Sequence, residues 1–158
     1  MQSLEAIVIL ENIRSAHNVG AIFRTAEAVG VSKIYLVGYT PAPIDRFGRP
    51  QKDIEKTALG AQNVVPWEHV EKSDSLIERL KNEGVTIYAV ERAQGAVDYK
   101  SVSVEGRVAV VLGNEVDGVE PTSCALADAV IEIPMRGMKE SLNVSVAAGI
   151  IFYRLFDT

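Results

Sequence analysis

With 158 residues and one cysteine, Cys124, the chain can bury a full hydrophobic core but cannot form an internal disulfide or a thiolate metal cluster. Its net charge of −5 argues against a general nucleic-acid binder, although a local basic patch can still bind RNA. No apolar run is long enough to span a bilayer, the first residues lack the basic start of a signal peptide, and His17 and His69 lack metal-ligand spacing. We therefore expect one cytoplasmic domain, residues 1–158, without a metal and without contact to a membrane.

The first half of the chain alternates between apolar runs and amphipathic segments. Residues 6–10 form an unbroken apolar run, which is typical of a buried parallel strand. A helix is predicted at residues 19–29, with Asn18 as its N-cap and Gly30 beyond its end. The remaining elements of this half are a strand at 33–37, a polar loop at 40–56, a short strand at 64–65 and a helix at 73–83.

The second half repeats this alternation. Its elements are strands at 85–90 and 107–112, a short helix at 121–127, a strand at 129–133 and a last helix at 143–156, which the chain enters through Ser141. Strands that alternate with helices predict an α/β domain, with a mainly parallel sheet flanked by helices. The last helix is apolar nearly all round, so it is buried on more than one side. This favours a subunit contact, and the alternative is a helix wholly buried within the monomer.

The start of the first helix combines a glycine with an arginine. Gly20 and Arg24 are four residues apart and share a helix face, and helical side chains lean toward the N-terminus. We expect Arg24 to reach back over Gly20 toward Asn18, which leaves room for a substrate group above the glycine. An arginine beside a helix N-terminus suits a phosphate or another anion. The alternative is a capping Asn18 and a solvated Arg24 paired with Glu27.

Two further segments place glycines and short polar groups where a strand ends or a helix begins. After the strand at 107–112, Gly113 lets the backbone approach a ligand, and Glu115 can accept a hydrogen bond or orient a cation; the alternative is an ordinary acidic turn. After the last strand, Ser141 and Asn143 supply polar groups beside an apolar wall; the alternative is a buried helix capped by Ser141. Ligands of open α/β sheets bind at such junctions, so the three segments predict one composite site.

In this order and at this spacing, the three segments resemble the motifs of the SpoU/TrmH branch of the SPOUT RNA methyltransferases. They read NVGAIFR at residues 18–24, LGNEVDG at 112–118, and IPMRGM followed by SLNVSVA at 133–147. The resemblance covers essentially the whole chain. It implies a C-terminal trefoil knot, S-adenosylmethionine as cofactor, a homodimer packed through the first and last helices, and methylation of a ribose 2′-hydroxyl in RNA. Many relatives carry an added RNA-binding part, and we expect this chain to be the methyltransferase core without that extension.

The same resemblance implies roles for individual residues. The cofactor would be held by Val90, Leu112, Gly113, Ile133, Met135 and Leu142. The reaction site would contain Arg24, Asn18, Glu115, Ser141 and Asn143. A guanidinium stays protonated in proteins, so holding a phosphate and stabilising the developing alkoxide is the role that suits Arg24.

The centre of the polar loop offers a contact for RNA. Arg46, Arg49 and Lys52 lie in a stretch without acidic residues and would bind phosphates; the alternative is a solvated loop. We expect tRNA as the substrate, with rRNA as the nearest alternative. A non-catalytic RNA- or partner-binding module with the same fold is a second alternative. A nucleotide-binding enzyme of ordinary doubly wound topology is a third, although the chain lacks a G-x-G-x-x-G after a strand and a P-loop.

Overall fold

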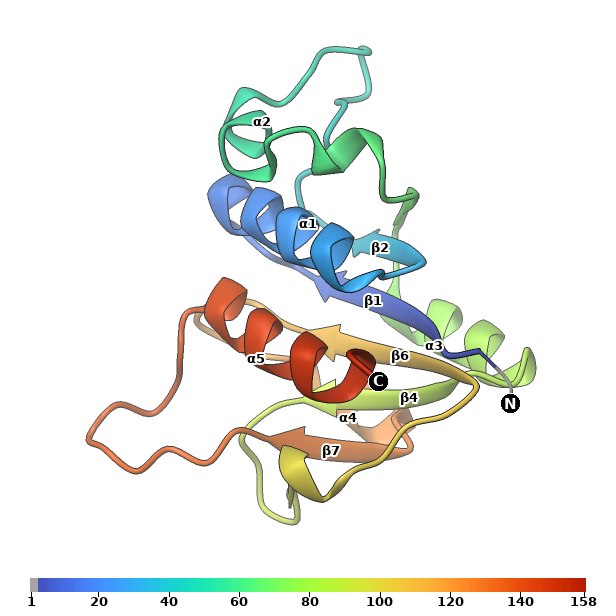
Figure 1. Cartoon of the computed structure of the whole chain (residues 1–158), viewed down its shortest axis with the longest axis vertical. Helices are drawn as coiled ribbons and strands as arrows, with labels where there is room; N and C mark the ends of the chain where they lie inside the picture. Colours follow the sequence, from blue (N-terminus) through green and yellow to red (C-terminus); the bar gives the residue numbers. More distant parts are fainter. Residues whose placement is uncertain (1–2) are drawn as a thin grey trace.

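Seven strands form one sheet in the computed structural model, which describes residues 3–158 (Figure 1). Their order across the sheet is β3-β2-β1-β6-β4-β7-β5, and each neighbouring pair runs parallel. The strands are β1 (Glu5–Glu11), β2 (Lys33–Val37), β3 (Trp67–Val70), β4 (Thr86–Val90), β5 (Val97–Asp98), β6 (Arg107–Leu112) and β7 (Ala129–Glu132). The predicted α/β domain with a mainly parallel sheet is therefore confirmed.

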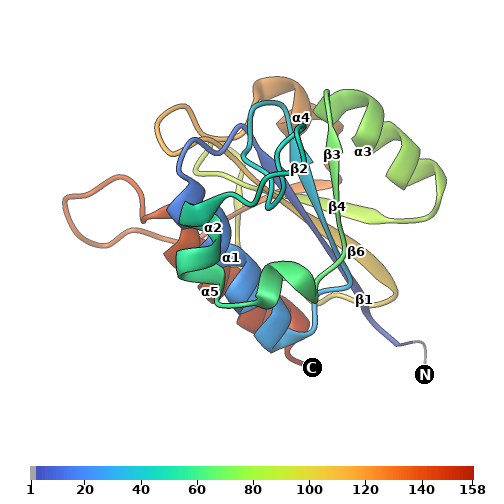
Figure 2. The ribbon, with the colours of Figure 1, turned by 90° about the horizontal axis from the view of Figure 1, so that it is seen from above.

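Helices cover both faces of the sheet. On one face lie α1 (Ala16–Val29), α2 (Lys52–Ala58) and α5 (Val144–Phe156), and on the other lie α3 (Ser73–Asn82) and α4 (Pro121–Leu126) (Figure 2). Two short 3₁₀ turns, Ala61–Asn63 and Tyr99–Ser101, join the remaining elements. α1 and α5 lie side by side in both views. Within residues 3–158, no helix combines the length and the apolar character that a membrane crossing requires.

Side-chain alternation along the central strands divides the core into two layers. In β1, Val8 and Leu10 belong to the layer under α1 and α5, whereas Ile7 and Ile9 belong to the layer under α3 and α4. All four side chains are buried. A strand that is covered on both faces has no polar side, which is why it appears in the sequence as an unbroken apolar run. Burial of each such side chain contributes about 1.5–3 kcal/mol to the stability of the fold.

Both helices that border the candidate site begin at residues other than those predicted. α1 has Ser15 as its N-cap, and the Ser15 Oγ accepts a hydrogen bond from the Asn18 backbone N–H at 3.1 Å. α5 has Asn143 as its N-cap, with a side chain that accepts from the Ser145 N–H at 2.9 Å. The predictions of Asn18 and Ser141 as caps are therefore wrong. Gly30 does end α1, with φ of 87° and its N–H bonded to two carbonyls of the last turn.

The structure also corrects the connections between β2 and α3 and around β5. Residues 52–58 of the expected polar loop form α2. This helix buries only Ile54 and Ala58, so the sequence lacks the longer apolar stripe that would have predicted a helix. The strand expected at 64–65 is wrong, because Val64 is exposed and the edge strand lies at Trp67–Val70. That strand mixes polar and apolar residues because only one of its long edges is paired. The two-residue β5 was not predicted at all.

The last helix is buried on one side and exposed on the other. Ala148, Ile151 and Phe152 are buried against the sheet and α1. On the opposite side, Val146 is 51% exposed and Tyr153 is 48% exposed. The alternative in which this helix is wholly buried within the monomer is therefore wrong, and a subunit contact over the exposed face stays a prediction.

Candidate active site

A cavity of about 1070 Å³ opens where β4, β6 and β7 end. The carboxyl ends of parallel strands meet at one edge of the sheet, and this is where α/β proteins bind ligands. All six residues expected to hold the cofactor line the cavity: Val90, Leu112, Gly113, Ile133, Met135 and Leu142. Glu115 and Ser141 of the expected reaction site line it as well. Arg24, Asn18 and Asn143 lie outside its lining, and the roles expected for all these residues stay predictions.

The loop after β6 is closed tightly upon itself. Asn114 and Gly118 exchange backbone hydrogen bonds of 3.1 and 2.9 Å, and the Asn114 Oδ1 accepts the N–H groups of Val116 and Asp117 at 2.8 Å each. A Cβ on Gly113 would collide with the backbone of Gly118 and Val119. Gly113 was expected to let the backbone approach a ligand, but its close neighbour is the other arm of the same loop. The glycine therefore shapes the cavity wall.

Glu115 ties this loop to the start of α1. Its carboxylate accepts the backbone N–H of Arg14 at 3.0 Å and that of Ser15 at 3.2 Å, and it accepts the Asn18 side-chain amide at 3.4 Å. Burial raises the pKa of the Glu115 carboxyl, but the hydrogen bonds from the backbone and from Asn18 outweigh it, so the pKa lies below its ordinary value. The carboxylate is therefore charged at neutral pH, next to the positive end of the helix dipole.

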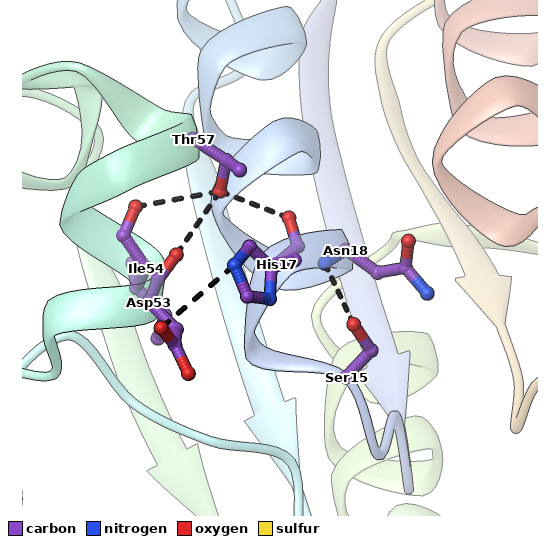
Figure 3. Close-up of polar contacts among 6 residues, drawn as sticks. All are labelled: Ser15, His17, Asn18, Asp53, Ile54 and Thr57. Atoms are coloured by element: carbon purple, nitrogen blue, oxygen red, sulfur yellow. Dashed lines mark hydrogen bonds and ion pairs between the residues drawn. The ribbon is translucent and has the colours of Figure 1, made fainter.

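Asn18 links the first segment to the third. Its Oδ1 accepts a hydrogen bond from the Asn143 Nδ2 at 3.3 Å, while the Asn143 Oδ1 caps α5. Figure 3 shows the Asn18 side chain directed away from α2, while its backbone N–H donates to the Ser15 hydroxyl. The chain of contacts Glu115–Asn18–Asn143 therefore joins three segments that lie far apart in the sequence. The structure thus brings the three segments together, and their action as one composite site stays a prediction.

The space above Gly20 is filled by α2, which overturns the expectation of room for a substrate group. Thr57 donates its hydroxyl to the His17 carbonyl at 2.9 Å (Figure 3). The same hydroxyl lies directly over the glycine. A Cβ on Gly20 would collide with the Thr57 hydroxyl and approach the Ile54 carbonyl oxygen to 2.5 Å. Gly20 therefore permits two helices to cross closely. The nearby contact between His17 and Asp53, at 3.7 Å, is half-exposed and contributes little.

Arg24 lies away from the cavity. It is exposed and lines a separate depression of about 590 Å³ together with Lys56, Thr57 and Tyr153. Within residues 3–158 its guanidinium makes no hydrogen bond with Asn18 and no ion pair with Glu27, so neither expected arrangement is found. The physical reason is that α2 occupies the path from Arg24 back over Gly20. Within one chain, the arginine and the cavity are separate.

Residues 5–153 match the SpoU rRNA Methylase family. The chain belongs to this family. It is 38% identical over 152 residues to the tRNA (guanosine(18)-2′-O)-methyltransferase of Aquifex aeolicus, a match that covers 94% of this chain and 67% of that protein. It is 33% identical to the 23S rRNA (guanosine-2′-O-)-methyltransferase RlmB of Xanthomonas axonopodis pv. citri, over 93% of this chain and 56% of that protein.

A solved structure gives the same assignment. The AdoMet-bound rRNA methyltransferase of Sinorhizobium meliloti superposes with a TM-score of 0.86 at 30% identity, over 95% of this chain and 55% of that one. The chain is thus a SpoU-family protein of the SPOUT class, and the α/β knot fold predicted from the motifs is confirmed. The chain spans between half and three quarters of the length of the proteins named here.

Two further carboxylates of this SpoU chain were missed in the sequence. Glu11 is fully buried and accepts the Glu120 N–H at 2.6 Å and the Ser123 hydroxyl. Glu91 lines the cavity and accepts the Val119 N–H at 2.8 Å. Each follows an apolar strand directly, which is the signal that drew attention to Glu115. Together they anchor the chain just beyond the loop at 113–118.

Side chains suited to a metal do not gather in the SpoU fold. Across residues 3–158, no group of three or more His, Cys, Asp or Glu residues is placed to hold an ion. His17 lies in α1 and His69 in the edge strand β3, and both are exposed. Cys124 lines the cavity, and burial, followed by the negative charges of Glu91 and Glu11, raises the pKa of its thiol. That thiol is therefore protonated at neutral pH.

Proposed function

We propose that this chain methylates the ribose 2′-hydroxyl of a tRNA nucleotide, with S-adenosylmethionine as the methyl donor. The class of enzyme, an RNA 2′-O-ribose methyltransferase that uses this donor, follows from membership of the SpoU family. The choice of tRNA is the finer step. It is supported by the higher identity to the A. aeolicus tRNA enzyme, 38%, than to the Xanthomonas rRNA enzyme, 33%. The rRNA alternative is kept because both relatives span most of the chain.

The cavity at the ends of β4, β6 and β7 is the proposed cofactor site. Its lining combines apolar side chains, among them Val90, Leu112 and Ile133, with the carboxylates Glu91 and Glu115. An apolar wall suits an adenosine ring, and carboxylates suit the sulfonium and ammonium charges of the donor. A volume of about 1070 Å³ is ample for a ligand of this size. When bound, S-adenosylmethionine supplies a methyl group on a sulfur that is a good leaving group.

The residues around the cavity would then orient the reacting hydroxyl. Asn18 and Asn143 hold each other at 3.3 Å, and Asn18 is fixed from its other side by Glu115. These contacts hold the polar rim in one geometry, which is the main contribution that such a reaction needs from the protein. Ser141 offers a hydroxyl at the cavity edge. We assign these four residues to the reaction site.

Arg24 acts in this proposal from a second copy of the chain. Its depression adjoins the exposed face of α5 through Tyr153, and Val146 on the same helix is exposed too. A homodimer packed through α1 and α5 would cover this apolar face and could bring Arg24 to the partner's cavity. There the guanidinium would hold a phosphate and stabilise the developing alkoxide. Arg46, Arg49 and Lys52 would contact further phosphates of the RNA.

The decisive experiment is transfer of a labelled methyl group from S-adenosylmethionine into total tRNA and total rRNA of a strain that lacks the gene. Nucleoside analysis then identifies the product. We expect a 2′-O-methylated nucleoside in the tRNA fraction and background label in rRNA. Label confined to rRNA would overturn the tRNA assignment but leave the enzyme class intact. Label in neither fraction, with the cofactor bound in calorimetry, would favour a non-catalytic binding module.

A further inference from the structure

An exposed aromatic side chain lies close to two arginines in the connection from β2 to α2. Phe47 is 66% exposed, and the guanidinium carbons of Arg46 and Arg49 lie 4.8 and 5.0 Å from the centre of its ring. A single exposed apolar residue is ordinary. An exposed ring with two guanidinium groups close to it is a different feature, because it combines a flat surface that can stack with two positive charges. We call residues 44–50 the aromatic finger.

The aromatic finger is ordered by its own hydrogen bonds. The Asp45 Oδ1 accepts the N–H groups of Phe47 and Arg49 at 2.8 and 3.0 Å, and its Oδ2 accepts the Arg49 Nε at 3.0 Å. Gly48 turns the chain with φ of 78°, and Ile44 pairs with Pro50 across the base. The pKa of Asp45 lies below its ordinary value, chiefly because its carboxylate accepts the backbone N–H of Arg49. Partial loss of solvation raises the pKa, but the further bonds from Phe47 and from the Arg49 side chain add to the lowering. Asp45 is therefore charged at neutral pH, and these bonds persist there.

This internal order matters for binding. A loop that is already folded loses little conformational entropy when a ligand arrives, so more of the contact energy appears as affinity. Asp45 neutralises only one of the two arginines, and across residues 3–158 the Arg46 guanidinium has no acidic partner. The aromatic finger therefore carries a net positive charge in a chain whose total charge is −5.

The connection that carries the aromatic finger leaves the sheet at the same edge as the cavity. It follows the carboxyl end of β2, which is separated from β6 only by β1, or by roughly 10 Å at the usual strand spacing. Earlier in the same connection, five residues before Ile44, the Tyr39 hydroxyl accepts a hydrogen bond from the Asn114 side chain at 2.9 Å. Asn114 belongs to the cavity lining. A direct contact thus joins the segment that leads into the finger to the wall of the proposed cofactor site.

We propose that the aromatic finger binds an unpaired nucleotide of the RNA substrate, with the base stacked on Phe47 and its flanking phosphates on Arg46 and Arg49. Proteins recognise unpaired nucleotides with aromatic rings and arginine planes in this way, whereas bases inside a duplex are not available for such stacking. The inference rests on the proposed function for the identity of the ligand as RNA. It adds that the enzyme recognises an unpaired nucleotide near the nucleotide that is methylated.

The test measures binding of a short single-stranded RNA of mixed sequence, and of the same strand annealed to its complement, at fixed salt by fluorescence anisotropy. Phe47→Ala and Phe47→Leu should each weaken binding of the single strand by about 5- to 150-fold, the equivalent of ~1–3 kcal/mol for one stacked base. Phe47→Trp should restore it, and duplex binding should not change. Arg46→Gln should weaken both and lower the salt dependence by about one counterion.

A matched control is Val64→Ala, because Val64 is 65% exposed, nearly the same as Phe47, but lies outside the aromatic finger. Its single-strand affinity should equal that of the parent. Parent-like affinity in Phe47→Ala overturns the proposal, as does parent-like affinity in Phe47→Leu, which keeps an apolar side chain without a ring. An equal loss of duplex binding would overturn it too.

Methyl transfer by the same proteins separates this inference from the proposed function. If the parent methylates RNA and Phe47→Ala keeps the parent KM for RNA, the function stands and the finger assignment fails. If the parent binds single strands through Phe47 but transfers no methyl group, the finger stands and the function fails. If the parent binds neither RNA, both fail.

Discussion

Glu115 offers the sharpest test of how the site is held together. Its carboxylate accepts two backbone N–H groups, from Arg14 and Ser15, and the Asn18 amide. Each such charge-assisted bond is worth ~1.5–3 kcal/mol when buried, but the site is partly exposed and water can replace part of the loss. We therefore expect Glu115→Ala to lower the free energy of unfolding by ~1–3 kcal/mol in total. That corresponds to about 2–12 °C in Tm for a domain of this size.

Glu115→Gln refines the prediction, because it keeps one acceptor oxygen and removes the charge. Its loss should be smaller than that of Glu115→Ala, and both should reduce methyl transfer because Asn18 loses its support. Thermal unfolding followed by circular dichroism measures the first effect. The matched control is Asp117→Asn in the same loop, which should melt with the parent. If both Glu115 variants also melt within about 1 °C of the parent, the carboxylate does not anchor α1.

The acid range gives an independent check. The folded-state pKa of Glu115 lies below the ordinary value of 4.5, so its contribution to stability is present above that pH. It is lost as the pH falls through the folded-state pKa. Glu115→Gln cannot titrate, so the difference in Tm between parent and variant should narrow progressively below pH 4.5. A difference that stays constant down to the acid limit of folding would show that the charge contributes nothing.

Three further predictions concern the proposed dimer, the arginine and the loop glycine. Sedimentation at micromolar concentration should give twice the chain mass of 17.1 kDa, and Val146→Asp on the exposed face of α5 should shift it toward the monomer. Arg24→Ala should keep the Tm and the S-adenosylmethionine affinity of the parent, but its rate of methyl transfer should fall by about 10²–10³-fold. Arg24→Lys keeps the charge without the planar guanidinium, so the activity that it recovers measures the contribution of charge alone. Gly113→Val should lose cofactor binding in calorimetry and also lower the Tm, since its side chain would collide with Gly118; overpacking costs ~1–3 kcal/mol.

Each of these predictions has an outcome that contradicts it. A strict monomer in the parent would remove the basis for placing Arg24 at a partner's cavity. Parent-like methyl transfer by Arg24→Ala would leave the arginine as a solvated helix residue. For Gly113→Val, a parent-like Tm would mean that the loop at 113–118 opens easily. The reference for that experiment is Gly137→Ala, because a Cβ on Gly137 meets nothing within 4 Å.

The central strands could be predicted from the sequence because they depend on short-range patterns. β2 at Lys33–Val37 and β6 at Arg107–Leu112 match the predicted bounds, since strands covered on both faces are continuous apolar runs. Residues at the ends of parallel strands meet at one edge whatever the details of packing. Val90, Leu112 and Ile133, which the resemblance to the SpoU/TrmH motifs assigned to the cofactor, line one such cavity.

Tertiary packing decided the rest. The sequence near Asn18 offers two residues that can cap a helix, and Ser15 takes that role while Asn18 contacts Glu115 and Asn143. No local pattern in the sequence indicates that α2 lies over Gly20. The contact with Thr57 joins two helices that are far apart in the chain, and neither helix alone shows which partner it crosses. The direction of Arg24 follows from that crossing. Periodicity specifies which side of an element is buried, but only the packed fold specifies which neighbour buries it.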